Sequence, residues 1–207
     1  MAAGLDTDAM LMLRVKRGDR AAFETLVGKY QQPVANVLGR MLGDPVEAED
    51  LTQSVFVQVF RSAHRYRESA RFSTWLYTIA RNLCLNELRR RSRHPAESLD
   101  ATRPDDANQP LHPIADPRAL SPPDRLLQQE LEQKIQEALD ALPPNQRLAV
   151  LLCRQEDVSY EEIARILDCS LSATKSLIHR GRETLKQRLK PYLQTGQWPG
   201  PGGGQQL

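Results

Sequence analysis

Residues 61–93 of this sequence contain nine arginines and only two acidic residues, Glu68 and Glu87. Four aromatic residues lie among them: Tyr66, Phe72, Trp75 and Tyr77. Guanidinium groups bind phosphates, and aromatic rings stack on unpaired bases. This combination predicts a surface for single-stranded nucleic acid. It also fits an ordinary helix with core aromatics and solvated arginines, and the residues alone leave both interpretations open.

A second basic segment follows a helix-turn-helix pattern over residues 159–182, SYEEIARILDCSLSATKSLIHRGR. Ser159 and Glu162 have the spacing of a capping box, which predicts a short helix over 160–167. Asp168-Cys169 is the expected turn, and Ser170 is the expected cap of a second helix. This pair of helices suits a helix-turn-helix whose second helix enters the DNA major groove. A helical hairpin that merely completes a core remains the alternative.

The outward side of the second helix carries the side chains that would meet DNA. Its first half holds no acid, and its donors are able to reach base edges or phosphates. The residues on this side are Ser172, Lys175, Ser176, His179 and Arg180. Further basic residues follow as Arg182, Lys186, Arg188 and Lys190, with Glu183 among them. This charge suits contacts to a phosphate backbone.

Residues for catalysis or metal binding have no comparable pattern. The three cysteines, Cys84, Cys153 and Cys169, form no CxxC pair, and we expect each to be a buried small hydrophobe. The four histidines are scattered, and the acids lie at helix starts and in one acidic segment. The sequence therefore predicts no metal, no cofactor, no small-molecule substrate and no enzymatic activity.

The elements that position the N-terminal basic residues read as helices. Asp19 is the expected cap of a helix over 21–42, with a kink or break at Pro33. Asp44 precedes Pro45 and predicts a second start, with a helix over 45–63. Residues 64–72 read as a loop, and Ser73 or Thr74 is expected to cap a helix over 74–91.

Hydrophobic periodicity indicates which helix faces are buried. In 45–63, Leu51, Val55 and Val59 recur every four residues, and Phe56 and Phe60 lie beside them. Further helices are expected over 124–142, 145–155 and 171–189, and no strand pattern competes with them.

Composition divides the chain of 207 residues into two parts. Residues 94–124 hold seven of its 14 prolines and six acids against two arginines, which predicts an extended, flexible, acidic linker. We expect an all-α protein with two small helical domains, 1–93 and 125–190, and a disordered tail at 191–207. No secretory signal and no membrane-length apolar run are visible, so a cytoplasmic location without membrane insertion is expected.

The motifs together resemble the extracytoplasmic-function (group 4) sigma factors of the sigma-70 family. The resemblance covers about residues 14–190 and depends on five stretches in this order: EAEDLTQSVF, RFSTWLYTIARNLCLNELRRR, ALPPNQRLAVLL, SYEEIARILDCS and KSLIHRGR. It implies a sigma region 2 in the first domain and a sigma region 4 in the second. The implied function is to bind core RNA polymerase, direct it to promoters with −10 and −35 elements, and promote DNA melting.

The resemblance also implies roles for individual residues. The residues that map to the polymerase-docking helix or its support are Asp50, Gln53, Ser54 and Phe56. The −10 element would be bound by Arg67, Ser69, Arg71, Phe72, Arg81, Asn82, Asn86, Arg89 and Arg90. The −35 element would be bound by Ser172, Ala173, Lys175, Ser176, His179, Arg180 and Arg182. Control by an anti-sigma factor is a further expectation from the family.

Three positions depart from the usual family pattern. Ser54 stands where a Glu is common, which is expected to weaken one polymerase contact, and Leu177 replaces a common Arg that would contact DNA. Gly181 lies inside a helix, where it costs about 1 kcal/mol relative to Ala.

Two rival functions are a helix-turn-helix regulator that acts without polymerase and an enzyme acting on nucleic acid. The first leaves the 44–93 pattern unexplained, and the second lacks a catalytic group of residues.

Overall fold

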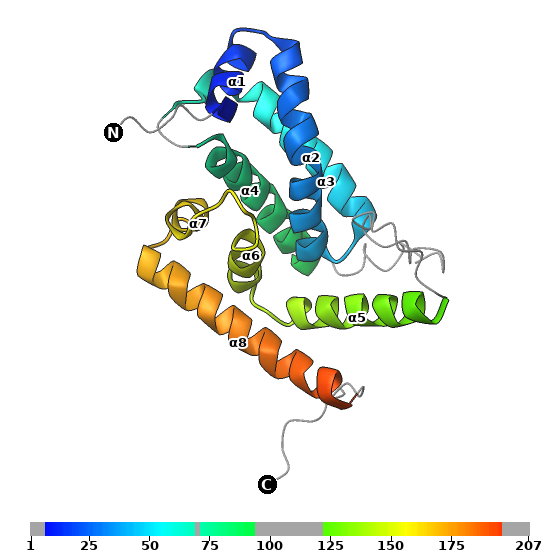
Figure 1. The fold of residues 1–207 in the computed structure, drawn as a ribbon. Coiled ribbons are helices and arrows are strands. Elements are labelled where there is room, and N and C mark those ends of the chain that lie inside the picture. Colours follow the sequence, from blue (N-terminus) through cyan, green and yellow to red (C-terminus); the bar gives the residue numbers. More distant parts are fainter. Residues whose placement is uncertain (1–6, 69–70, 94–121, 196–207) are drawn as a thin grey trace.

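The computed structural model describes residues 7–68, 71–93 and 122–195 (Figure 1). These residues are helical throughout their regular structure and contain no strand, which confirms the all-α prediction. The helices before the undescribed segment 94–121, called here the N-terminal unit, are α1 (Thr7–Lys16), α2 (Arg20–Leu42), α3 (Pro45–Arg61), the short 3-10 helix η1 (Ala63–Arg65) and α4 (Phe72–Arg93). Those after it, called the C-terminal unit, are α5 (Pro122–Asp140), α6 (Pro144–Leu152), α7 (Tyr160–Leu167) and α8 (Leu171–Thr195).

Side-chain caps begin several helices where the sequence predicts them. Asp19 accepts a hydrogen bond from the Ala22 amide at 3.1 Å, and Asp44 accepts from the amides of Val46 and Glu47 at 2.9 and 3.1 Å. Each cap satisfies backbone N–H groups that have no partner within the helix. The starts of α2 and α3 are therefore fixed locally.

Two helix boundaries differ from the sequence prediction: the break that was one alternative at Pro33 is absent, and α4 starts earlier than predicted. Helix α2 continues through Pro33 without a break, because its apolar face is buried at Tyr30, Val34 and Val37 and holds both halves in place. Helix α4 begins at Phe72, so Ser73 and Thr74 are buried residues of its first turn and not its cap. The amide of Trp75 instead donates to the carbonyl of Arg71 at 3.3 Å.

The ends of the C-terminal unit also lie beyond the predicted limits. Helix α5 begins at Pro122, inside the predicted linker, and α8 continues through Pro191 to Thr195, inside the predicted tail. Tyr192 is buried, so packing extends the helix past the proline. The predicted linker over 94–121 and the predicted tail over 196–207 lie outside the described residues.

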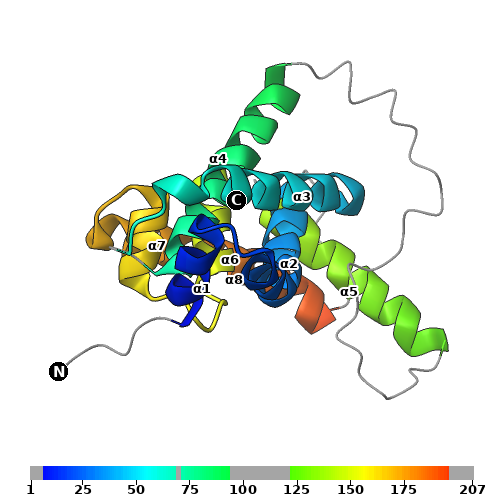
Figure 2. The same cartoon turned by 90° about the horizontal axis from the view of Figure 1, so that it is seen from above.

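The two units pack against each other. Helix α4 packs against α7, and α2 packs against α5 and α6, with α5 crossing near the end of α2 (Figure 1). One cluster of buried apolar side chains continues from Leu76 and Ala80 of α4 to Leu152 and Ile163 of the C-terminal unit. Figure 2 shows the last turns of α4 and the first turns of α5 extending beyond the packed helices.

Candidate nucleic-acid interface

Helices α7 and α8 form the helix-turn-helix that the sequence predicts. Ser159 Oγ accepts from the Glu162 amide at 3.3 Å, and a Glu162 carboxylate oxygen accepts from the Ser159 amide at 2.7 Å, which completes the capping box. Asp168 ends α7 with a φ of 54°, and Ser170 Oγ accepts from the Ala173 amide at 3.1 Å to begin α8. A non-glycine residue in the left-handed region suits a tight helix C-cap when it is Asp or Asn. The relative direction of α7 and α8 is therefore set by local backbone bonds.

Helix α8 presents its predicted DNA-binding residues to solvent as one exposed face. Its buried side consists of Thr174, Ile178 and Gly181, with Leu171 and Leu185 partly buried beside them. The exposed residues include every member of the predicted −35 set: Ser172, Ala173, Lys175, Ser176, His179, Arg180 and Arg182. A shallow depression on this face is lined by Ser172, Lys175, Ser176, His179 and Arg180.

Gly181 and Leu177 face the protein interior and not the DNA-binding side. A Cβ atom at residue 181 would lie 2.6 Å from Val150 Cγ2 of α6, closer than side chains approach one another. The glycine therefore permits α8 to cross α6 closely. Leu177 is partly buried against the core cluster, so its apolar side chain suits this position.

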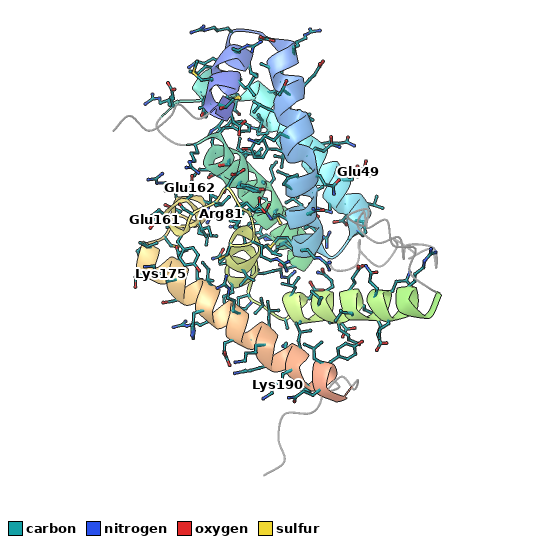
Figure 3. All side chains as sticks on the ribbon, in the orientation of Figure 1. Glu49, Arg81, Glu161, Glu162, Lys175 and Lys190 are labelled. Carbon is teal, nitrogen blue, oxygen red and sulfur yellow. The ribbon has the colours of Figure 1, made fainter. Side chains whose placement is uncertain are left out.

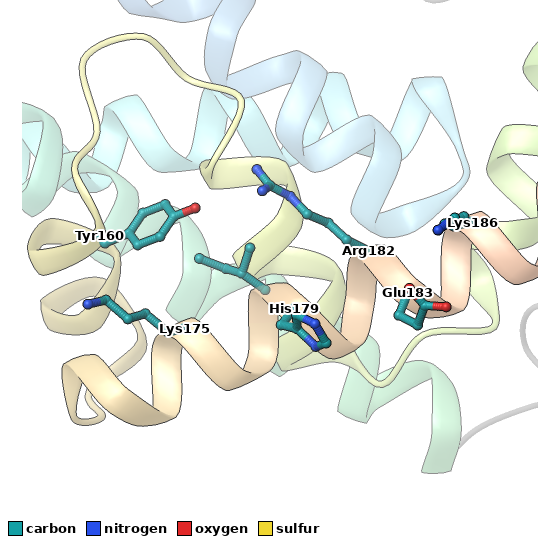
Figure 4. A pocket seen from close by; sticks show the side chains of 7 residues that line it. Tyr160, Lys175, His179, Arg182, Glu183 and Lys186 are labelled. Carbon is teal, nitrogen blue, oxygen red and sulfur yellow. The ribbon is translucent and has the colours of Figure 1, made fainter.

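A recess of about 260 Å³ between α7 and α8 adds a residue that the sequence prediction missed (Figure 4). Its lining residues are Tyr160, Lys175, Ile178, His179, Arg182, Glu183 and Lys186. Tyr160 is the first residue of α7, and its phenol shares the recess with basic side chains of α8. The only signal in the sequence is an aromatic residue directly after the cap Ser159. Tyr160 is thus a further candidate for a phosphate contact.

Helix α4 places four of the nine predicted −10 residues on a second basic face. Asn82, Asn86, Arg89 and Arg90 are exposed at helical spacing. Arg89 donates to Asn86 at 3.0 Å, and Arg90 donates to Glu87 through its Nε and Nη2 atoms at 2.9–3.2 Å. Exposed ion pairs of this kind contribute little to stability. These side chains can therefore exchange a neighbour for a phosphate at small cost.

Phe72 does not belong to this exposed face, and its contact with DNA stays a prediction. Its side chain is 0% exposed, and its ring packs against Tyr30 and Tyr66 with centroids 5.3 and 6.3 Å away. Tyr66 itself is buried, as is Tyr77, while Trp75 is half-buried. The aromatic residues among the arginines are thus largely core, the alternative that the composition left open. Arg67 is exposed on the segment before α4, and Ser69 lies outside the described residues.

One arginine of the predicted −10 set has polar contacts with the C-terminal unit, and a second is half-buried on α4. Arg71 lies beside Glu162 of α7 at 3.5 Å and donates to the carbonyl of Asp157 at 3.4 Å. Arg81 is half-buried, and its Nε is buried without a hydrogen-bond partner. Figure 3 labels Arg81 on α4 and Glu162 on α7.

Helix α3 carries the predicted polymerase-docking residues on the side of the molecule opposite Lys175 (Figure 3). Asp50, Gln53 and Ser54 are exposed, whereas Phe56 is buried and supports the helix from beneath. Phe60 is 48% exposed, which corrects its assignment to the buried stripe, and its ring lies 5.1 Å from that of Phe23. Val57 and Phe60 extend this exposed face toward the end of α3. The sequence pattern alone did not indicate either residue, because apolar side chains in a helix are usually assigned to its buried side.

Burial changes the titration of two groups at the junction of the units. It raises the pKa of the Cys84 thiol to about 12, so this thiol stays protonated at neutral pH. It also lowers the pKa of Arg147, against the opposing effect of Asp140, with which Arg147 forms a 2.8 Å ion pair.

Cys84 is fully buried as predicted, but Cys153 and Cys169 are only partly so. Cys153 accepts a hydrogen bond from Arg182 at 3.0 Å.

The described residues contain no group of histidine, cysteine, aspartate and glutamate side chains arranged to hold a metal ion. Over the same ranges, no helix combines the length and hydropathy that a membrane span requires.

Comparisons with protein families match both units. The model described as Sigma-70 region 2 matches residues 26–94, and the one described as Sigma-70, region 4 matches residues 132–185. The RNA polymerase sigma-H factor of Pseudomonas aeruginosa is 35% identical over 189 residues, which cover 91% of this chain and 96% of that protein. The ECF RNA polymerase sigma-E factor of Escherichia coli is 34% identical over 190 residues, which cover 90% of this chain and 96% of that protein.

Solved structures share the fold. The structure of CnrH in complex with the cytosolic domain of CnrY matches with a TM-score of 0.64 at 22% identity, over 90% of this chain and 99% of that one. The sigma factor RpoE in complex with the anti-sigma factor NepR from Bartonella quintana matches with a TM-score of 0.62 at 24% identity, over 81% of this chain and 96% of that one. Both matches extend over the N-terminal and C-terminal units.

Proposed function

Because the chain belongs to the ECF RNA polymerase sigma factors of the sigma-70 family, we propose that it binds core RNA polymerase through α3 and recruits it to promoters through α4 and α8. The observation that carries this proposal is the presence of three separate exposed faces on one chain. Two of them are basic, and the third, on α3, carries Glu49 and Asp50. A protein that binds two promoter elements and also binds RNA polymerase needs three such faces.

The face of α8 is proposed to read the −35 element as duplex DNA. Ser172 and Lys175 lie in the first turns of the helix, where residues of a recognition helix contact base edges. Arg180, Arg182 and Lys186 lie farther along, where they suit phosphate contacts. Tyr160 supplements this set from the start of α7.

The face of α4 is proposed to follow the −10 element after melting. Asn82 and Asn86 offer amide groups to bases, and Arg89 and Arg90 offer charge to the backbone. Phe72 acts from the core, where it fixes the first turn of α4. Melting of the −10 element unstacks a base, and we propose that the segment around Arg67 holds this base. The nearby residues Ser69 and Ala70 lie outside the described residues.

Regulation and location follow from the same assignment. We propose a cytoplasmic protein without catalytic activity of its own, which an anti-sigma factor holds inactive. The family expectation is supported by solved structures of the same fold, one of which is a sigma factor in complex with an anti-sigma factor. The rival regulator that acts without polymerase leaves the exposed face of α3 without a role.

Transcription in vitro tests the proposed recruitment. Core RNA polymerase is supplied with bacterial promoter fragments in the presence and absence of the protein, and transcripts are mapped at their 5′ ends. We expect specific start sites only with the protein. If the protein neither binds core polymerase nor yields start sites, the proposal is wrong.

A charge-matched pair of variants tests the −35 face. Lys175→Ala with Arg180→Ala removes two contacts worth about 1–3 kcal/mol each, so recruitment should fall at least about tenfold while core binding is unchanged. Arg17→Ala with Arg20→Ala removes the same charge from exposed residues near the α1–α2 junction and serves as the control. Equal losses in both pairs would indicate a nonspecific charge effect.

A second matched pair tests the docking face. Asp50→Lys reverses an exposed charge on α3, and Glu24→Lys does the same on α2. Only the first should weaken binding to core polymerase, measured by fluorescence anisotropy of the labelled chain. Unchanged binding in Asp50→Lys would remove α3 from the proposed interface.

A further inference from the structure

The basic side chains of α8 continue beyond the part of the helix that is proposed to read the −35 element. Four exposed residues follow one another at spacings of seven, four and four, which places them on one side of a helix: Lys175, Arg182, Lys186 and Lys190. Figure 3 shows Lys175 near the start of α8 and Lys190 toward its end. The last two of these residues, Lys186 and Lys190, are called here the distal basic stripe.

The charge of α8 is out of proportion to that of the whole chain. The helix contains six lysines and arginines and one acid, Glu183, whereas the formal net charge of all 207 residues is only +2. No acid follows Glu183 in the sequence. The carboxylate of Glu183 accepts a hydrogen bond from the Gln187 amide at 3.2 Å. The one acid of the helix is therefore engaged by an amide and not by a lysine.

The distal basic stripe is not accounted for by contacts within the molecule. Lys29 of α2 pairs with Asp8, and Lys134 of α5 pairs with Glu137 at 3.1 Å. Among the residues that the structure describes, neither lysine of the distal basic stripe has such a carboxylate partner. A helix dipole stabilises cations only within the last turn, and the last turn of α8 contains no basic residue. The stripe is thus an uncompensated cationic surface that suits an external polyanion.

The length of α8 determines which part of a duplex the distal basic stripe can contact. From Ser172 to Arg180 the helix rises about 12 Å, which matches the width of about 12 Å of the major groove. Lys186 begins about 9 Å farther along the axis. When Ser172 and Arg180 lie in the groove, the stripe therefore lies past the base edges, where the duplex presents phosphates. Its two lysines are about 6 Å apart along the axis, close to two steps of about 3.4 Å along one strand.

The recess between α7 and α8 connects the distal basic stripe with the proposed −35 face. Its lining residues include Lys175 and His179 of that face, Lys186 of the stripe and Tyr160 of α7 (Figure 4). The two surfaces are therefore continuous on one side of one helix. A continuous surface of this kind fits a single duplex, whereas a separate acidic protein would have to share it with the DNA.

We propose that Lys186 and Lys190 bind the phosphate backbone of the duplex that flanks the −35 element, so that α8 holds DNA over a longer stretch than the one it reads. The contact does not depend on base sequence, because phosphates carry no sequence information. It supplies affinity and not specificity, so promoters with poor base contacts depend on it most. This inference rests on the proposed function, since it extends the duplex contact of α8.

The length of the DNA tests the proposed flanking contact. The full chain is titrated, by fluorescence anisotropy, into a labelled duplex that ends at the edges of a −35 element from a mapped promoter. A second duplex carries about one further helical turn, about ten base pairs, on each side. The wild-type chain should bind the longer duplex at least about fivefold more tightly, with a salt dependence steeper by about 0.9 for each of the two phosphates. Random replacement of the flanking sequence should leave this affinity unchanged.

Two variants with equal loss of charge make the test specific. The chain with Lys186→Gln and Lys190→Gln should bind both duplexes equally, and α8 should persist because glutamine favours helices nearly as well as lysine. The control, Arg17→Gln with Arg20→Gln, removes the same charge from exposed residues near the α1–α2 junction and should keep the preference for the longer duplex.

The possible failures are distinguishable. Equal affinity of the wild-type chain for both duplexes would overturn the flanking contact. An undiminished preference after removal of Lys186 and Lys190 would also overturn it, and would assign the distal basic stripe to an acidic protein partner. If the wild-type chain binds neither duplex, the proposed −35 face fails, and the flanking contact fails with it.

Discussion

Single side chains decide how closely the recognition helix can approach its support. Gly181 is conspicuous in the sequence as a helix-breaking departure, but in the structure it is the point where α8 crosses α6. Phe72 is conspicuous as an aromatic residue among arginines, but it fills the core beneath α4. In both cases the environment of the side chain, and not its chemical type, determines its role.

Gly181→Ala should destabilise the protein although alanine favours helices. Its Cβ would meet Val150 Cγ2, and overpacking costs about 1–3 kcal/mol against a gain of about 1 kcal/mol in helix propensity. Val150→Ala removes the colliding methyl groups, so adding this second change should restore part of the loss. Urea unfolding of the two single variants and the double variant measures this coupling, and additive effects would contradict the proposed close approach.

Phe72→Ala should act on stability before it acts on promoter opening. Removing a fully buried phenylalanine costs about 3–5 kcal/mol. Phe60→Ala is the control, since its ring is 48% exposed and should lose much less. Chemical denaturation followed by circular dichroism compares them. A Phe72→Ala protein as stable as wild type that opens promoters slowly would return Phe72 to the DNA-binding set.

Helix ends set the directions in which the functional faces point. The starts of α3, α7 and α8 depend on short-range bonds from Asp44, Ser159 and Ser170 to backbone amides. Because each of these bonds joins residues that are neighbours in sequence, its formation does not require contacts between the two units. The end of α2 differs, since Arg91 donates to the Leu42 carbonyl at 2.9 Å and Arg147 to that of Met41 at 2.8 Å.

Asp44→Ala should destabilise α3 by about 1 kcal/mol, because two backbone amides lose their acceptor. Asp44→Asn retains a capping oxygen and should lie within a few tenths of a kcal/mol of wild type. Thermal unfolding and core-polymerase affinity are measured on both. The Ala variant should bind core less tightly, since α3 carries the proposed docking face. Equal stability of both variants would exclude the cap as a contributor.

The whole molecule behaves, on this structure, as one packed body with three outward faces. The apolar cluster continues across both units, and the polar contacts of Arg147 lie where they meet. A continuous core predicts that the units unfold together.

Calorimetry should therefore show one cooperative transition for the wild-type chain, with equal calorimetric and van't Hoff enthalpies. Arg147→Ala removes the buried bond to the Met41 carbonyl and the ion pair to Asp140, at a cost of about 1–3 kcal/mol. We expect this variant to unfold in two transitions, while the exposed Arg165→Ala retains one. Two transitions in the wild-type chain would mean that the units are already uncoupled.

Local sequence was sufficient to predict the helices, most of their caps and the exposed face of α8. A capping box or a four-residue apolar repeat involves residues that are neighbours along the chain, so their physics is contained in a short stretch. The resemblance to the polymerase-docking helix singled out Asp50, Gln53 and Ser54, which are exposed on α3. The resemblance to sigma factors came from the order of these stretches.

Only the tertiary structure determined which charged and aromatic side chains are exposed and able to contact nucleic acid. Phe72 is core because Tyr30 and Tyr66 surround it, and Arg71 lies beside Glu162 because α7 packs against α4. Gly181 suits its helix because Val150, thirty-one residues earlier, leaves no room for a methyl group. Each of these outcomes depends on contacts between residues far apart in sequence, and the packing of helices creates such contacts only when the chain is folded.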